Sequence, residues 1–306
     1  MRKFYLFFSL LILFCLACKT PPAVPTLNVP PPPEGTPVST LSFDRIKAGG
    51  INQIDLYFRL RIENPRAVPL KITIHGWKTA LNGTNLDPKT AVLDVDNSAA
   101  FQGSIEAAPK DAVDIGLCLH LDMSSEETAA GIKSRSGTGP DEDEYHVELS
   151  LDLSYQYDTS KIFKGEASIT TAFPRVREPE FYITSIAILK AELINTRFRV
   201  NLQIDNPNAF PVTLSSFRYE LYGDGLFWAD GREQNVLYIP AKSSAETRLF
   251  LSMNFINMRR HLLDEIIAMR QVNYRFAGDV EIGIDIPWLP HFKMKFDHSG
   301  LSEVLK

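Results

Sequence analysis

The chain has 306 residues, of which 44% are hydrophobic, 10% aromatic and 23% charged, a composition that excludes a disordered polymer and leaves room for two folded domains. Its formal net charge is −5, and loss of residues 1–17, with their two basic side chains, would make it −7. Binding of nucleic acid needs a concentrated cluster of Lys and Arg, which the sequence lacks, so we exclude a nucleic-acid partner.

The N-terminus has the layout of a secretory signal peptide. After two basic residues, Phe4–Leu16 is an apolar run too short to cross a bilayer comfortably. It ends at Ala17 and Cys18, and a small residue directly before a cysteine resembles the lipobox of bacterial lipoproteins, although Cys15 stands where leucine is usual. We therefore expect residues 1–17 to be a lipoprotein signal peptide and Cys18 to be the lipid anchor. The alternative is an uncleaved signal anchor, and both readings place the rest of the chain outside the cytoplasm.

A proline-rich stretch follows the cysteine. Residues 19–40 contain eight prolines, which fix the backbone dihedral φ and remove hydrogen-bond donors. This composition predicts an extended polyproline II spacer, so residues 18–40 form a lipidated tether in our interpretation.

The most informative feature is a duplication at an offset of 142 residues, which relates residues 54–69 to residues 196–211. Each copy starts with apolar and polar side chains in strict alternation, which is typical of an antiparallel strand with one buried face. The apolar sides of the two strands are Leu56, Phe58, Leu60 and Ile62, and Phe198, Val200, Leu202 and Ile204.

Each of these strands ends at an acidic-Asn-Pro triplet with a second proline four residues later. Proline cannot donate a hydrogen bond to a neighbouring strand, and an asparagine side chain can bond to backbone groups of a turn. The motif predicts a strand end followed by re-entry into the next strand, and we assign it a structural role. Its residues are Asn64, Pro65, Pro69, Asn206, Pro207 and Pro211.

The two copies also agree downstream of this motif. Gly83 and Gly223 mark turns, and two later prolines precede predicted strands over Ala112–Met123 and Glu246–Phe255. A helix is expected next in each copy, over Ser125–Lys133 and from Asn257 onward.

Two more alternating strands close each copy. The sequence thus predicts a mostly β protein of two tandem antiparallel β-sandwich domains, each with one helix. We place the domains at 41–175 and 182–300, joined by Pro174–Phe181.

At the Asn-Pro motif the sequence resembles the group-two late-embryogenesis-abundant (LEA) family, also called the water-stress and hypersensitive-response (WHy) domain. The matching residues are Ile62–Ile72 and Ile204–Leu214, with the glycine turn and the proline-led strand after them. The resemblance covers residues 41–300 and is more specific in the second copy. It implies small β-sandwiches similar to fibronectin type III domains, an association with protection under water stress, and no catalytic residue.

The sequence shows no constellation typical of an enzyme. The six histidines lack the spacing of a zinc site, and no nucleotide-binding or nucleophile motif occurs. His120 and Asp122 lie at a spacing of two and could hold a metal, but with no further ligand we interpret them as a surface pair and expect no metal or cofactor. The loop Ser136–Glu144 holds four carboxylates without the spacing of a calcium loop.

Three other residues are candidates for the core or for a binding surface. Cys118 lies between two leucines and is interpreted as a small buried core residue. Trp228 and Trp288 could line a binding surface, although partial burial is the commoner fate of tryptophan.

These observations predict an exported, non-enzymatic envelope lipoprotein that acts as a binding or stress-protective module. Its expected partners are the membrane, through the N-terminal lipid, and envelope proteins or lipid, at the outer membrane or the periplasmic face. The alternative is a periplasmic carrier of lipid or another hydrophobic ligand, which requires an apolar cavity between the sheets. A hydrolase has only the scattered histidines in its favour.

Overall fold

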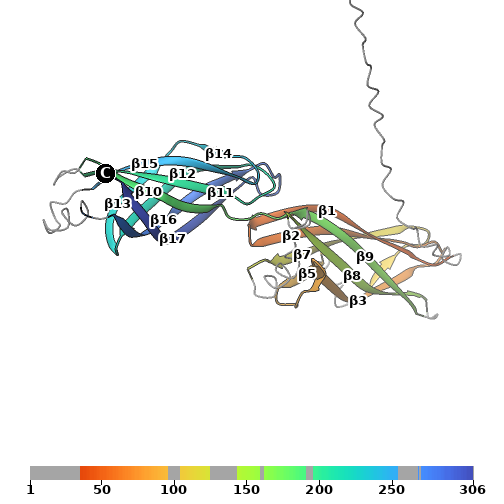
Figure 1. Cartoon of the computed structure of the whole chain (residues 1–306). Coiled ribbons are helices and arrows are strands. Elements are labelled where there is room, and N and C mark those ends of the chain that lie inside the picture. Colours follow the sequence, from red (N-terminus) through yellow and green to blue (C-terminus); the bar gives the residue numbers. More distant parts are fainter. Residues whose placement is uncertain are drawn as a thin grey trace, which may run out of the picture. The chain divides into compact units, whose positions relative to one another are not determined.

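The computed structural model describes residues 35–95, 104–124, 143–158, 162–190, 196–253, 268 and 270–305 (Figure 1). The strands of its N-terminal part are β1 (Val38–Gly50), β2 (Gln53–Glu63), β3 (Leu70–Leu81), β4 (Thr84–Asn85), β5 (Ala91–Val95), β6 (Ile105–Ala107), β7 (Ala112–Asp122), β8 (Glu144–Tyr157) and β9 (Phe163–Pro174). Those of its C-terminal part are β10 (Glu180–Lys190), β11 (Thr196–Asn206), β12 (Val212–Gly223), β13 (Leu226–Glu233), β14 (Leu237–Ile239), β15 (Ser243–Met253), β16 (Gln271–Ile284) and β17 (His291–Leu305).

The N-terminal strands form two sheets around one core. One sheet has the order β1-β2-β7-β5, and the other has the order β4-β3-β8-β9 with β6 paired to β3. Buried side chains of both sheets meet between them, among them Leu56 and Leu117 from the first sheet and Ile72 and Leu149 from the second. This region is a β-sandwich.

The C-terminal strands repeat the arrangement with one difference. The order β10-β11-β15 corresponds to β1-β2-β7, and β12-β16-β17 corresponds to β3-β8-β9. Here β10 and β17 are joined by a short parallel pairing, so the two layers form one continuous sheet. A second core, which includes Phe198, Leu202, Phe217 and Phe276, fills the space that this sheet encloses.

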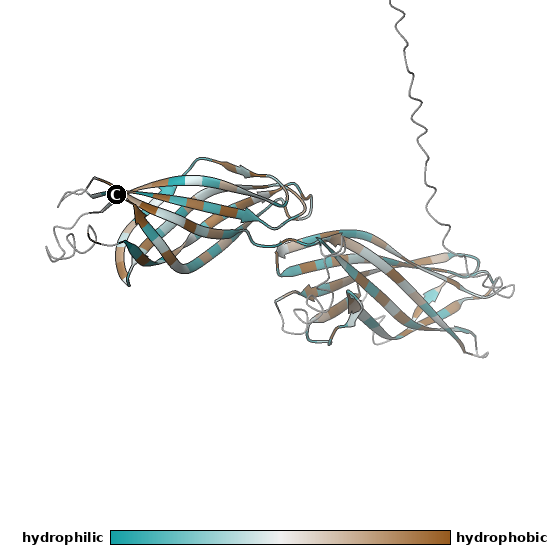
Figure 2. Cartoon of the chain, viewed as in Figure 1, coloured by the Kyte–Doolittle hydropathy of each residue, from teal (hydrophilic) through white to brown (hydrophobic). Residues whose placement is uncertain are grey.

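The predicted mostly β, sandwich-type fold is confirmed. Apolar and polar residues alternate along the strands (Figure 2), and in β2 and β11 the apolar residues named from the sequence are buried. Both predicted helices lie outside the described residues, in segments 125–142 and 254–267. Within the described ranges, no helix is long and apolar enough to span a membrane.

The two sandwiches differ at one sheet edge. In the first, β5 pairs antiparallel with β7 and covers the edge of that strand. In the second, β13 stays on β12 instead, and among the described residues the ladder of β15 is with β11 alone. Among the residues that the structure describes, no strand forms a ladder with the outer edge of β15, although β13 and β14 lie near it, whereas the first domain pairs the equivalent edge with β5.

Candidate functional site: an open sheet edge with an apolar pocket

The two motif asparagines make matching sets of hydrogen bonds. The buried amide of Asn64 donates from Nδ2 to the carbonyl oxygens of Val68 and Ala108, at 2.8 Å each, and its Oδ1 accepts from the backbone N–H of Arg66 at 3.1 Å. It thereby links the turn after β2 to the segment that leads into β7.

Asn206 repeats this pattern in the second domain. Its Nδ2 donates to the carbonyl oxygens of Phe210 and Pro240, at 2.9 Å each, and its Oδ1 accepts from the backbone N–H of Asn208 at 3.0 Å. Asn208 adds two bonds that sequence reasoning missed, because its side-chain amide pairs with both backbone groups of Arg177, at 2.7 and 2.9 Å. The side-chain hydrogen bonds of Asn64 and Asn206 thus stabilise the turns that follow β2 and β11.

The four prolines of the motif lie in the turns that follow β2 and β11. Pro65 and Pro69 are exposed in the turn between β2 and β3, and Pro207 and Pro211 are half-buried in the equivalent turn between β11 and β12. Cys18 lies outside the described residues.

The structure also shows where the two tryptophans, the acidic loop and the turn glycine lie. Trp228 is buried and stacks on Phe198 at 5.5 Å, so it belongs to the core rather than to a binding surface, while Trp288 is half-buried. Of the acidic loop, only Asp143 and Glu144 are described. The turn glycine of the second domain is Gly225, with φ of 80°, because β12 continues through Gly223.

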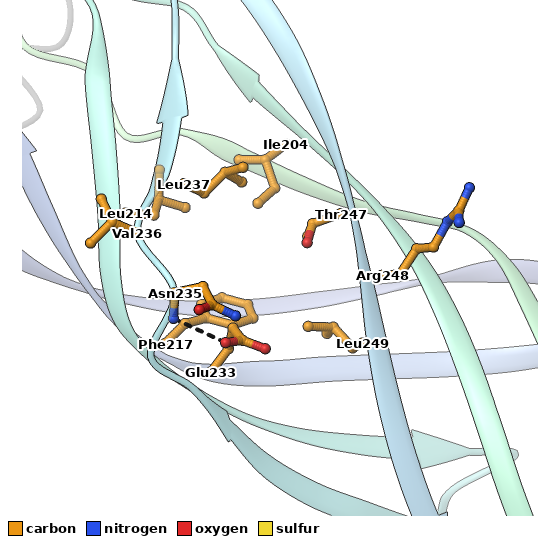
Figure 3. A pocket seen from close by; sticks show the side chains of 10 residues that line it. All are labelled: Ile204, Leu214, Phe217, Glu233, Asn235, Val236, Leu237, Thr247, Arg248 and Leu249. Carbon is orange, nitrogen blue, oxygen red and sulfur yellow. Dashed lines mark hydrogen bonds between the residues drawn. The ribbon is translucent and has the colours of Figure 1, made fainter.

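The pocket lies beside the open edge of β15, where β13 and β14 approach it (Figure 3). Its volume is about 140 Å³. Buried apolar side chains form its floor, and Val236, 67% exposed, stands at its rim. The lining residues that carry the argument are Ile204, Leu214, Phe217, Leu237, Thr247 and Leu249.

Polar side chains also line this pocket, among them Glu233, Asn235 and Thr247. Glu233 Oε1 accepts hydrogen bonds from the backbone N–H groups of Gln234 and Asn235, at 3.0 and 2.9 Å, and so orders the turn between β13 and β14. The side chain of Arg248 points away from the other lining residues (Figure 3). An apolar floor beneath an ordered polar margin suits an apolar group presented by a partner with its own polar backbone.

The ring of Tyr219 lies 5.5 Å from that of Phe217, which lines the pocket. Burial, together with the carboxylates of Glu233 and Asp230, raises the pKa of Tyr219 to about 12. This phenol therefore stays protonated at neutral pH and does not act as an acid or a base there.

The exposed apolar residues around the edge were visible in the sequence but not interpretable from it. Tyr238 and Phe250 are 59% and 68% exposed, and both lie on the strands that border the pocket. Each lies at a position where the alternation of its strand predicts a polar residue. A large apolar side chain at such a position was the signal that the sequence offered for an exposed apolar surface.

Comparison with known proteins gives a partial match. Residues 201–300 match the sequence profile of a family described as late embryogenesis abundant protein, and this supports the expectation of that family. No curated protein sequence matches the chain significantly.

Solved structures give weak likenesses. A crystallised protein from Archaeoglobus fulgidus is 16% identical, with a TM-score of 0.25, and the match covers 42% of this chain and 95% of that one. A protein from Arabidopsis thaliana, solved in solution, is 13% identical, with a TM-score of 0.32, over 43% of this chain and 85% of that one. The assignment of the fold rests on the strand pairing described above.

Proposed function

We propose that this chain is a non-enzymatic envelope lipoprotein of the LEA type 2 (WHy) kind, whose second domain binds an extended peptide segment along β15. Both sandwiches belong to this family in the proposal, because both carry the same asparagine turn. Anchoring through Cys18 and export to the cell envelope rest on the signal-like N-terminus.

The open edge of β15 is the observation that carries the proposal. An edge strand presents unpaired backbone N–H and C=O groups, to which an extended peptide can add as a further strand. β15 has 11 residues and contains neither lysine nor proline, the residues with which proteins often block such edges.

The first domain shows what kind of segment such an edge accepts. β5 lies against β7, the counterpart of β15, and it is a strand of five residues. Its alternate residues Ala91 and Leu93 are buried, while Val92 and Asp94 are exposed. We therefore expect the partner of β15 to be a short extended segment with apolar side chains at alternate positions.

The volume of the pocket beside β15 favours a peptide side chain over a lipid as its occupant. About 140 Å³ is close to the volume of an engineered apolar cavity that binds benzene, roughly 150 Å³. Pockets for larger ligands run from about 300 to 1,000 Å³. One apolar side chain fits this pocket and an acyl chain does not, which favours the binding module over the hydrophobic-ligand carrier.

The experiment measures binding of a labelled peptide to the full chain by fluorescence anisotropy. The probe carries residues 89–96 (KTAVLDVD), the segment around β5, and a scrambled peptide without alternation is the peptide control. We expect saturable binding of the first peptide alone.

A pair of variants on β15 locates the site. Thr247→Phe places an aromatic ring in the pocket and should abolish binding, whereas Glu246→Phe adds the same ring on the opposite face and should leave it intact. If the two variants bind the peptide equally well, the pocket is not the binding site. Turnover of a defined substrate by the purified chain, or a stoichiometric co-purified lipid in native mass spectrometry, would reject the proposed function.

A further inference from the structure

Three side chains with metal-binding chemistry converge on the outer face of the β1-β2-β7-β5 sheet. Asp55 lies on β2, and Cys118 and His120 lie on β7. Their carboxylate, thiol and Nδ1 ligand atoms all lie within 4.8 Å of one another. The Nδ1 atom of His120 is 2.7 Å from Oδ1 of Asp55 and 3.9 Å from Sγ of Cys118.

Strand register, not sequence proximity, brings these groups together. Asp55 is directly opposite His120 in the β2–β7 ladder, and Cys118 shares the outer face with His120 because side chains two residues apart point the same way. Cys118 is buried, as expected from the sequence, but it does not belong to the core cluster that includes its neighbours Leu117 and Leu119.

The structure gives His120 and Asp122 separate hydrogen-bond partners. Asp122 accepts hydrogen bonds from the backbone N–H and the hydroxyl of Ser124, at 2.9 and 2.6 Å. His120 is instead held between Asp55 and Asp94, whose Oδ2 atom is 3.2 Å from Nε2.

We propose that Asp55, Cys118 and His120 bind one zinc-class divalent ion, with water as the fourth ligand. Thiolate, imidazole and carboxylate form a ligand set that suits Zn²⁺. Tetrahedral zinc with ordinary bond lengths places sulfur and nitrogen about 3.5 Å apart, and nitrogen and oxygen about 3.3 Å apart. The observed separations of 3.9 and 2.7 Å lie within about 0.6 Å of these values, a difference that small side-chain rotations supply.

Asp94 supplies the outer contact that metal-binding histidines usually have. A histidine ligand typically donates its other ring N–H to a carboxylate, which orients the ring. Nε2 of His120 meets Asp94 in this way, which leaves Nδ1 to the ion. On binding, the Cys118 thiol releases its proton to solvent, and His120 keeps the Nε2 proton that faces Asp94 while the lone pair of Nδ1 binds the ion.

The duplicated domain provides an internal comparison. The residues that pair at the equivalent positions of β11 and β15 are Arg197 with Ser252 and Arg199 with Phe250. These side chains offer no comparable ligand set, so the site predicts one ion per chain.

The test is a titration of the full chain with Co²⁺, a spectroscopic substitute for Zn²⁺. A thiolate-to-cobalt charge-transfer band and the visible bands of tetrahedral cobalt should grow to one equivalent, and added Zn²⁺ should bleach them. Cys118→Ser should lose the charge-transfer band, and His120→Ala should weaken binding by roughly 100-fold or more.

Matched variants separate binding from folding. Asp94→Asn should weaken binding by roughly 10–100-fold while the charge-transfer band remains. His75→Ala removes a histidine that hydrogen-bonds to Ser154 in the other sheet, at 2.7 Å, and should leave binding unchanged. Zn²⁺ should also raise the melting temperature of the wild type but not of Cys118→Ser. A charge-transfer band that persists in Cys118→Ser, or no band in the wild type at millimolar Co²⁺, would overturn the proposal.

Discussion

Replacing Asn206 by alanine tests how much one buried amide contributes to the second domain. The side chain is 2% exposed, and its removal leaves the carbonyl oxygens of Phe210 and Pro240 and the N–H of Asn208 without this partner. At about 1 kcal/mol for each of these three hydrogen bonds, and with the bond from Asn208 Nδ2 to Asn206 Oδ1 at 2.9 Å also lost, the free energy of unfolding should fall by at least roughly 3 kcal/mol. For a domain of this size, at roughly 4 °C per kcal/mol, the melting temperature should fall by about 12 °C.

Urea unfolding followed by tryptophan fluorescence measures this change, because Trp228 is buried in the core of the same domain. Asn201→Ala is the matched control, since that half-buried side chain donates a hydrogen bond to Ser185 Oγ at 2.6 Å, and its loss should cost less than about 1 kcal/mol. Asn206→Asp keeps the shape and the acceptor but turns a negative oxygen toward two carbonyl oxygens, so it should destabilise at least as much as alanine at neutral pH. A loss below about 1 kcal/mol for Asn206→Ala, or an Asn206→Asp variant as stable as the wild type, would refute this reasoning.

Three further predictions concern alkaline stability, close packing and the anchor. The pKa of Tyr219 is raised to about 12, so its contribution to stability is complete below the ordinary pKa of about 10 and is lost as the pH rises through about 12. Tyr219→Phe should therefore flatten the fall of the urea midpoint between these values, and an unchanged slope would contradict it. A Cβ atom added at Gly278 would lie 2.0 Å from the backbone oxygen of Arg218, so Gly278→Ala should lower the free energy of unfolding by roughly 1–3 kcal/mol. Gly50→Ala, where nothing lies within 4 Å, should be nearly neutral, and equal losses would count against the packing argument. Intact-mass analysis of membrane-extracted protein should show a diacyl or triacyl mass on a chain beginning at Cys18, and Cys18→Ala should lack it; an unlipidated wild type would remove the anchor.

Local alternation was sufficient to predict the strands that bury one face. In β2 and β11 the apolar residues occupy every second position, so the sequence indicates directly which face of each strand is buried and which is exposed. β1 was missed, because much of it is exposed and a register shift between Phe43 and Arg45 breaks its alternation. β1 begins at Val38, inside the predicted tether, and β17 runs to Leu305, past the predicted end of the second domain.

Pairing between distant strands was beyond sequence reasoning. After the glycine turn, β5 pairs with β7 in the first domain, whereas β13 pairs with β12 in the second, and this difference determines whether the outer edge of β7 or β15 is paired. The residues of β5 and β13 do not by themselves indicate which strand each will pair with. The same limit hid the neighbours of His120, since Asp55 and Asp94 lie 65 and 26 positions away and are adjacent only through register.

The parallel pairing of β10 with β17 has a mechanical consequence. These are the first and last strands of the second domain, and they pair side by side at Ser185–Glu303, Ile186–Val304 and Ala187–Leu305. Because the two strands run in the same direction, a pull applied to the two ends of the domain acts along them, and it loads their hydrogen bonds in shear. Bonds loaded in shear must break together, whereas bonds that are unzipped break in succession. We therefore expect the second domain to resist stretching between its ends more strongly than its thermodynamic stability alone would predict.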